Sequence, residues 1–155
     1  MKTNNFIIRK ARLEDVGRCV DLGESFHAAS YWRSRTFSPE RTEAYARNAI
    51  ENPRKLFLVS ENDEGVYGYF IANWSEMFFT DERVSDEEVL WVQEGSGTVW
   101  TMRDFFKEWQ KWAKENGCTL LFYNPTSHGH FADKWDKFMN RYGYEKAGAS
   151  YRKEL

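Results

Sequence analysis

Several features that would place this chain of 155 residues in a particular environment are scarce. It has two cysteines, Cys19 and Cys118, which lie far apart and belong to no motif, so we expect reduced thiols in a cytoplasm. Apolar runs such as 56–59 are short, and none approaches the roughly 20 residues that span a bilayer. The first residues lead into a strand-like run without the apolar core of a signal peptide. We therefore expect neither secretion nor a membrane partner.

Charge of one sign is also not in excess. The 22 lysines and arginines face 24 acidic residues, and the formal net charge is −2, which gives no broad basic field for nucleic acid. Trp32, Arg33 and Arg35 form only a small basic and aromatic group, so no nucleic-acid partner is expected. The aromatic content of 17% argues against disorder. The length fits one domain, which we place over residues 1–155.

Hydrophobic periodicity predicts strands interleaved with helices. Strand-like runs lie at 6–11, 55–60, 66–72, 89–92 and 119–123, with closing strand material at 144–155. Helical patterns start at Leu13, span 38–52, precede Gly117 and return at 131–142. The clearest amphipathic helix carries Trp109 and Trp112, and helical spacing places these, with Trp100 and Trp135, in the core or at its edge. The acidic stretch 81–88 is expected to be an exposed loop, and so is the segment 30–37.

The element order is therefore β-α-α-β-β-β-α-β-α-β. A turn at 61–65 joins two strands as an antiparallel hairpin. The later β-α-β unit, from 92 to 123, requires parallel strands and a right-handed crossover. The sequence thus predicts a single α/β (α+β) domain with a mixed sheet and helices on both faces.

This order resembles the GNAT family of N-acetyltransferases, which use acetyl-CoA. Four segments carry the resemblance: IIRKARLEDV (7–16), FLVSENDEGVYGYFIA (57–72), LWVQEGSGTVWTMRDFFKEWQKWAKENGC (90–118) and FMNRYGYEKAGASYRKEL (138–155). The chain is most similar to small stand-alone members often found in tailed phages. The resemblance implies direct transfer of acetyl from acetyl-CoA to a primary amine of a small molecule or protein, with no metal and no covalent enzyme intermediate. Monomer and homodimer both stay open.

The loop between the strand 89–92 and the next helix is the candidate cofactor loop. Glycines let a backbone approach a pyrophosphate closely, and a helix N-terminus offers free N–H groups. The candidate cofactor-binding residues are Val92, Gln93, Gly95, Ser96, Gly97, Thr98 and Thr101, with Asn124 implied by the resemblance as a partner for the pantetheine amides.

Two alignments of this loop with the family pattern compete. Counting from Gln93 puts Ser96 and Thr98 at the positions for small residues. Counting back from 112–118 puts Trp100 and Met102 there instead, where large side chains would block the pyrophosphate, and this alignment agrees with a helix capped by Thr101.

The catalytic residues follow from the resemblance. Glu88 stands where several relatives place a glutamate that acts as the base through water. The usual acid is a tyrosine on the last helix, and its position here falls on Met139, which cannot donate a proton. Tyr142 is the nearest hydroxyl in sequence and is the candidate acid. The methionine supports an alternative, a GNAT-fold protein without catalysis that serves as a binding or virion-associated protein.

The acceptor side is expected at the segment after the first helix. Tyr31, Trp32 and Arg33 are candidate substrate contacts, with His27 before them and His128 in the loop before the last helix. Two histidines, His128 and His130, are too few ligands for a metal site. Aromatic and cationic groups favour a carboxylate-bearing or aromatic acceptor, whereas the acidic stretch 81–88 favours a cationic one. The two indications oppose each other, so the acceptor stays open.

Overall fold

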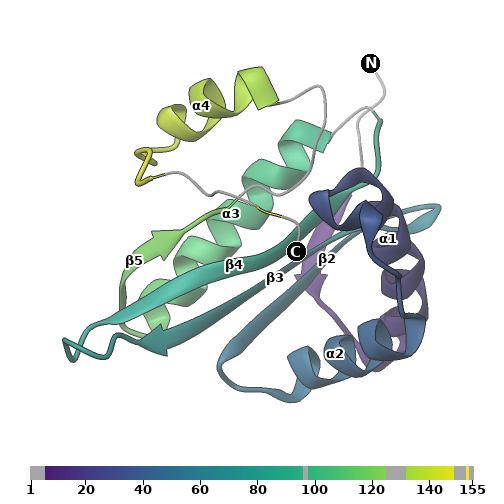
Figure 1. The fold of residues 1–155 in the computed structure, drawn as a ribbon, viewed down its shortest axis with the longest axis horizontal. Helices are drawn as coiled ribbons and strands as arrows, with labels where there is room; N and C mark the ends of the chain where they lie inside the picture. Colours follow the sequence, from purple (N-terminus) through teal and green to yellow (C-terminus); the bar gives the residue numbers. More distant parts are fainter. Residues whose placement is uncertain (1–5, 96–97, 125–131, 149–152, 154–155) are drawn as a thin grey trace.

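A five-stranded sheet forms the centre of the protein, with strands in the order β1-β2-β3-β4-β5 (Figure 1). The computed structural model describes residues 6–95, 98–124, 132–148 and 153. The strands are β1 Ile7–Lys10, β2 Lys55–Asn62, β3 Gly65–Glu76, β4 Arg83–Val92 and β5 Cys118–Phe122. The helices are α1 Val16–Ala29, α2 Pro39–Glu51, α3 Thr98–Glu115 and α4 Ala132–Arg141, with short 3-10 turns at Leu13–Asp15 and Tyr31–Ser34.

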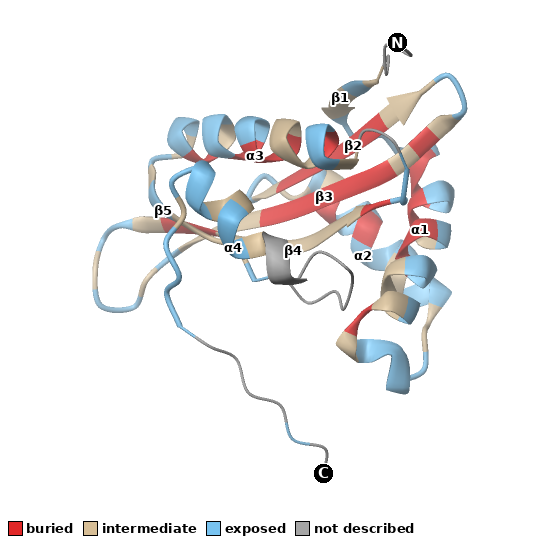
Figure 2. Cartoon of the chain, turned by 90° about the horizontal axis from the view of Figure 1, so that it is seen from above, coloured by how far each residue is buried: buried red, intermediate tan, exposed pale blue. Residues whose placement is uncertain are grey.

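Strands β1 to β4 pair antiparallel, and β5 pairs parallel to β4. Helices α1 and α2 cover one face of the sheet and α3 covers the other (Figure 2). Helix α4 lies on the α3 side, where the rings of Phe106 and Phe138 are 6.0 Å apart. The predicted mixed sheet with helices on both faces is confirmed. None of the described helices combines the length and apolarity needed to cross a membrane.

Local chemistry sets the ends of α2. The hydroxyl of Ser38 accepts a hydrogen bond from the Arg41 N–H at 3.3 Å, and Pro39 occupies the first helical position. The helix ends at Glu51, two residues before Pro53, because the residue before a proline avoids the helical conformation. This agrees with the predicted helix to within one residue.

Each face of the sheet has its own hydrophobic core. On the α3 side, Phe70 stacks on Phe105 at 5.8 Å and lies 5.2 Å from Trp109. The buried indole N–H of Trp109 donates to the Ser85 hydroxyl at 2.8 Å. On the other face, α1 and α2 bury Leu22, Ala46 and other apolar residues against β2 and β3.

The predicted loop at 81–88 is wrong, because most of this acidic stretch belongs to β4. Val84 and Ser85 are buried between β3 and β5, and Arg83 stacks over the ring of Trp74 at 4.2 Å. The hairpin strands are therefore longer than predicted, and its exposed tip carries Phe78 and Phe79. Acidic composition suggested a loop, but tertiary contacts hold the strand.

Three further expectations differ from the structure. Helix α3 begins at Thr98, three residues before the predicted start. Trp100 is 56% exposed and not part of the core, since it stands on the outer side of the first helical turn. Residues 144–148 and 153 form no strand, and the rest of the predicted closing strand lies outside the described residues.

Candidate active site

Strands β4 and β5 are paired over only half of β4. The parallel register runs from Arg83 opposite Cys118 to Asp86 opposite Phe122 and stops there, while β4 continues to Val92. From Glu87 onward, the edge of β4 that faces β5 has no strand partner among the described residues. Its backbone groups on that edge are therefore available to a ligand that carries amides.

A bulge in β4 falls at the start of this free edge. Opposite β3, Ile71 pairs with Val89 and Ala72 pairs with Glu87, so Glu88 is the extra residue. A bulge redirects side chains. Glu88 points to the α2 side, where it contacts Tyr45, whereas Glu87 lies next to the backbone of Asn124.

Glu88 is held by three donors. Lys55 Nζ lies 2.8 and 2.6 Å from its two oxygens, Asn73 Nδ2 donates at 2.7 Å, and the hydroxyl of Tyr45 donates as well. Burial raises the pKa of Glu88, but hydrogen bonds from Lys55, Tyr45 and Asn73 lower it more, so the net shift is downward. A carboxylate stabilised in this way is a weak proton acceptor.

Glu87 has the opposite character. The pKa of Glu87 is raised to about 8, mainly by burial and also by the charges of Glu88 and Asp86, while the backbone N–H of Asn124 opposes the shift. A carboxyl group with a pKa near the working pH is suited to proton transfer. The local sequence contains no signal for this bulge, so it could not show that Glu87 and Glu88 have different surroundings.

Hydrogen bonds hold the β4–α3 loop at both of its ends. The N–H of Gln93 donates to the Tyr67 carbonyl at 2.9 Å, and Arg18 Nη2 donates to the Gln93 side-chain oxygen at 3.1 Å. The hydroxyl of Thr98 bonds the carbonyl oxygens of Gln93 at 3.2 Å and Gly95 at 3.0 Å. Among the described residues beyond its chain neighbours, no atom lies within 4 Å of the place where a Cβ on Gly95 would be.

The observed helix start favours the alignment counted from Gln93, with Thr98 at a position for a small residue. Ser96 and Gly97 lie outside the described residues. Val92 is buried at the end of β4 and precedes the loop. Helix α3 begins at Thr98, after the loop that contains Gly95. The first backbone N–H groups of the helix therefore follow this loop.

The cap predicted at Thr101 is wrong. Thr101 lies inside α3, is completely buried, and its hydroxyl is 2.7 Å from that of Tyr67. Met102 packs into the α3-side core, and the ring of Trp100 stacks with Arg103 at 4.8 Å. The two large residues therefore point to the core and to solvent.

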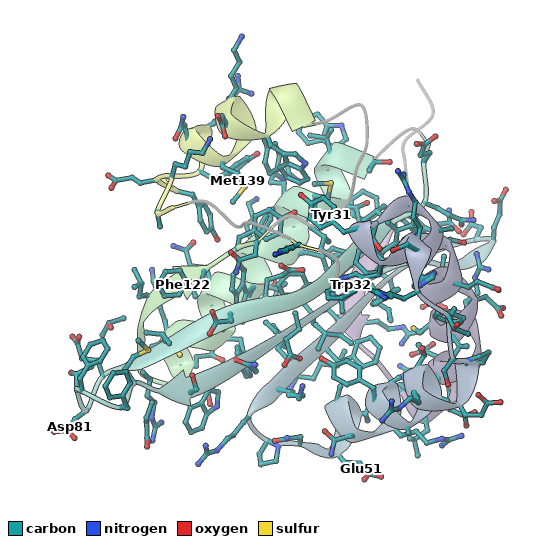
Figure 3. The ribbon with its side chains drawn as sticks, in the orientation of Figure 1. Tyr31, Trp32, Glu51, Asp81, Phe122 and Met139 are labelled. Atoms are coloured by element: carbon teal, nitrogen blue, oxygen red, sulfur yellow. The ribbon has the colours of Figure 1, made fainter. Side chains whose placement is uncertain are left out.

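Two described tyrosines, Tyr123 and Tyr45, lie close enough to Glu87 for its charge to raise their pKa values. Burial raises the pKa of Tyr123 well above its usual value, and the charge of Glu87 adds to this. Tyr142, the predicted acid, follows α4, is partly exposed, and packs its ring 4.9 Å from Phe138. Met139 packs against the α3-side core, on the helix above α3 (Figure 3). Asn124 follows Tyr123 and is exposed.

A cavity of about 460 Å³ lies between α1, α2 and the sheet. His27 and Trp32, both predicted substrate contacts, are in its wall, whereas Tyr31 and Arg33 are not among its described lining residues. The Ser30 hydroxyl accepts from the Trp32 N–H at 3.2 Å and so starts the 3-10 turn that carries Trp32. His128 lies outside the described residues.

No group of three metal-ligating side chains is found in the described part of the chain. The thiols of Cys19 and Cys118 are free.

Known structures share this fold. An aminoglycoside acetyltransferase from an uncultured soil metagenomic sample superposes with a TM-score of 0.73 at 11% identity, covering 97% of this chain and 99% of that one. Ribosomal-protein-alanine N-acetyltransferase from Brucella melitensis biovar Abortus 2308 gives 0.69 at 17% identity, with 97% and 99% covered. Glucosamine-6-phosphate N-acetyltransferase from Arabidopsis thaliana gives 0.71 at 11% identity, again with 97% and 99% covered.

The sequence itself matches no protein-family model and no curated protein. At these identities the structural likeness establishes the fold, which is that of the GNAT acetyltransferases, as the element order predicted. The similarity to phage members stays a prediction.

Proposed function

We propose that this chain transfers an acetyl group from acetyl-CoA to a primary amine. The observation that carries this proposal is the free edge of β4 from Glu87 to Val92, which leads into a glycine-containing loop and the N-terminus of α3. Pantetheine amides suit an unpaired strand edge, and a pyrophosphate suits the N–H groups at a helix start. The open space at Gly95 leaves room for such an approach.

The residues present fit the donor. Acetyl-CoA, when bound, would supply the acetyl group as an activated thioester. Val92, Gln93 and Gly95 would line its path with backbone groups, and Thr98 keeps the loop in shape through its two hydrogen bonds. The backbone N–H of Asn124 bonds Glu87, and the side-chain amide of Asn124 could bond the pantetheine arm.

We assign the base role to Glu87 in place of Glu88. An alkylammonium must lose a proton before its nitrogen can attack, and a carboxylate that takes this proton needs a pKa close to the working pH. The raised pKa of Glu87, about 8, meets this need, while Glu88 is bonded to Lys55, Asn73 and Tyr45. Glu88 then holds the bulge in place and acts as a positioning residue.

Tyr123 is the proposed acid. Its raised pKa keeps the hydroxyl protonated at neutral pH, and it lies beside Glu87 at the opening. It therefore replaces Tyr142 in this role, and it removes the need for a hydroxyl at Met139.

Isothermal calorimetry with acetyl-CoA, with CoA and ATP as controls, tests the donor site. We expect saturable one-to-one binding of acetyl-CoA and a raised melting temperature at concentrations well above the dissociation constant. No binding at millimolar acetyl-CoA would contradict the proposal. It would favour the alternative of a GNAT-fold binding or virion-associated protein, for which Met139 at the usual acid position is the supporting observation.

Release of free thiol from acetyl-CoA in the presence of an amine tests the catalytic roles. Glu87→Gln should lower kcat by about 100-fold, the scale of general base catalysis. Glu88→Gln should change kcat less, because its carboxylate does not take the proton.

The free thiols of Cys19 and Cys118 support a cytoplasmic location, and monomer or homodimer stays a prediction.

A further inference from the structure

The cavity between α1, α2 and the sheet has the size and lining of a small-molecule site. Its volume of about 460 Å³ falls within the range of roughly 300–1,000 Å³ that is typical of ligand pockets. Its wall is mainly apolar and includes Phe26, Phe37, Phe57, Tyr69, Ile71 and Val89. Such a wall favours a ligand with a large apolar group.

One buried polar atom in this wall lacks a partner. His27 Nε2 is buried and has no hydrogen bond with the described residues. Buried polar atoms are rarely left unpaired in folded proteins, so this nitrogen suggests a contact that a ligand completes.

Arg41 is the one charged side chain in the described lining apart from the titratable His27, and no described carboxylate pairs with it. It lies on α2 one turn before Tyr45, which also lines the cavity and whose hydroxyl contacts Glu88. A ligand in this cavity would therefore be lined by the cation of Arg41 from α2 and by Val89 from β4.

Two of the acidic groups that favoured a cationic acceptor, Glu88 and Asp81, are not available to this cavity. Glu88 is already paired with Lys55 at 2.6 Å. Asp81 is at the tip of the β3–β4 hairpin, across the molecule from Trp32 at the cavity (Figure 3). These two residues therefore give no support to a cationic acceptor in this cavity.

We propose that the acceptor is a free amino acid with a large apolar side chain. The side chain fills the cavity, the α-carboxylate pairs with Arg41, and the α-amine is directed toward β4. This inference rests on the proposed acetyl transfer. In that reaction the amine nitrogen forms a bond to the acetyl carbon, the carbon–sulfur bond breaks, Glu87 takes the amine proton, and the thiolate of CoA leaves and is protonated.

The test compares L-phenylalanine with phenethylamine, which has the same ring and amine but no carboxylate, and with spermidine, a polycation. Acetylated products are measured by mass spectrometry with acetyl-CoA as donor. We expect L-phenylalanine to give the highest kcat/KM. Arg41→Gln should raise KM for L-phenylalanine by about tenfold, equivalent to about 1.4 kcal/mol, because it removes a charge-assisted hydrogen bond.

The same substitution should leave KM for phenethylamine unchanged. Arg47→Gln is the matched control, since Arg47 is on the same helix but pairs with Glu43 at the surface. Preference for phenethylamine or spermidine, or an equal effect of Arg41→Gln on both ring-bearing acceptors, would overturn the amino-acid inference and leave acetyl transfer standing.

If no acetylated product forms, calorimetry distinguishes a failure of the acetyl-transfer proposal from a failure of the amino-acid proposal. Failure to bind acetyl-CoA would overturn acetyl transfer by itself. L-phenylalanine titrated into the protein alone then decides the specificity of the cavity. Saturable binding that Arg41→Gln weakens about tenfold would support it, and absence of binding would overturn it.

Discussion

The Lys55–Glu88 pair should contribute more to stability than the exposed Arg47–Glu43 pair on α2. The side chain of Lys55 is 12% exposed and that of Glu88 is 22% exposed, with Nζ 2.6 Å from the carboxylate. Removing one partner of a fully buried pair costs about 3–5 kcal/mol. Tyr45 and Asn73 still donate to Glu88, and the site is not fully buried, so Lys55→Met should lower the free energy of unfolding by about 2 kcal/mol.

A double-mutant cycle with Lys55→Met and Glu88→Gln, measured by urea unfolding at neutral pH, isolates the pair. We expect a coupling energy of about 1–2 kcal/mol. The matched control is the Arg47–Glu43 pair on α2, whose side chains are 51% and 49% exposed at a separation of 2.8 Å. Its coupling should be only about 0.3–0.5 kcal/mol, as for other exposed pairs four residues apart on a helix.

The dependence on pH follows from the lowered pKa of Glu88. A carboxyl group with a lower pKa in the folded state contributes its full stability above the unfolded pKa, about 4.5, and loses it as the pH falls below that value. The difference between wild type and Lys55→Met should therefore narrow on acidification. A coupling energy no larger than that of the Arg47–Glu43 control, or a difference independent of pH, would refute this account.

Three further predictions concern β4 and its surroundings. Ser85→Ala should cost about 1–3 kcal/mol in urea unfolding, because the buried N–H of Trp109 loses its acceptor; a cost near zero would contradict this. Gly68→Ala should destabilise by about 1–3 kcal/mol, since the new Cβ would lie 3.0 Å from a β4 carbonyl, whereas Gly17→Ala, with open space around it, should be neutral or stabilising in the same assay. The raised pKa of Glu87 means that the unfolded chain releases a proton the folded protein keeps, so stability should fall as the pH rises from about 4.5 to about 8; Glu87→Gln should flatten this fall in unfolding free energy, and an unchanged slope would show that Glu87 is not the group responsible.

Local sequence was sufficient for much of the fold. Ser38 and Pro39 determine where α2 starts, because a capping hydroxyl and a fixed backbone angle act within one turn. The β2–β3 hairpin and the amphipathic α3 follow from short-range periodicity in the same way. The order of these elements was enough to predict the fold shared with acetyltransferases.

The candidate site was predicted only in outline. A loop follows Val92, and His27 and Trp32 line one cavity, while their roles with cofactor and acceptor stay predictions. The sequence favoured Glu88 and Tyr142, whereas we propose Glu87 and Tyr123 from the structure. The sequence contains no signal for the bulge that separates the surroundings of Glu87 and Glu88.

Tertiary structure decided the chemistry of these carboxylates and of the cavity. Glu87 and Glu88 are adjacent and identical in sequence, yet burial raises the pKa of one and three donors from α2, β2 and β3 lower that of the other. The cavity likewise exists only because α1 and α2 stand over the sheet. Periodicity is a property of neighbouring residues, whereas desolvation and hydrogen bonding depend on residues far apart in the chain, and only the folded protein brings those together.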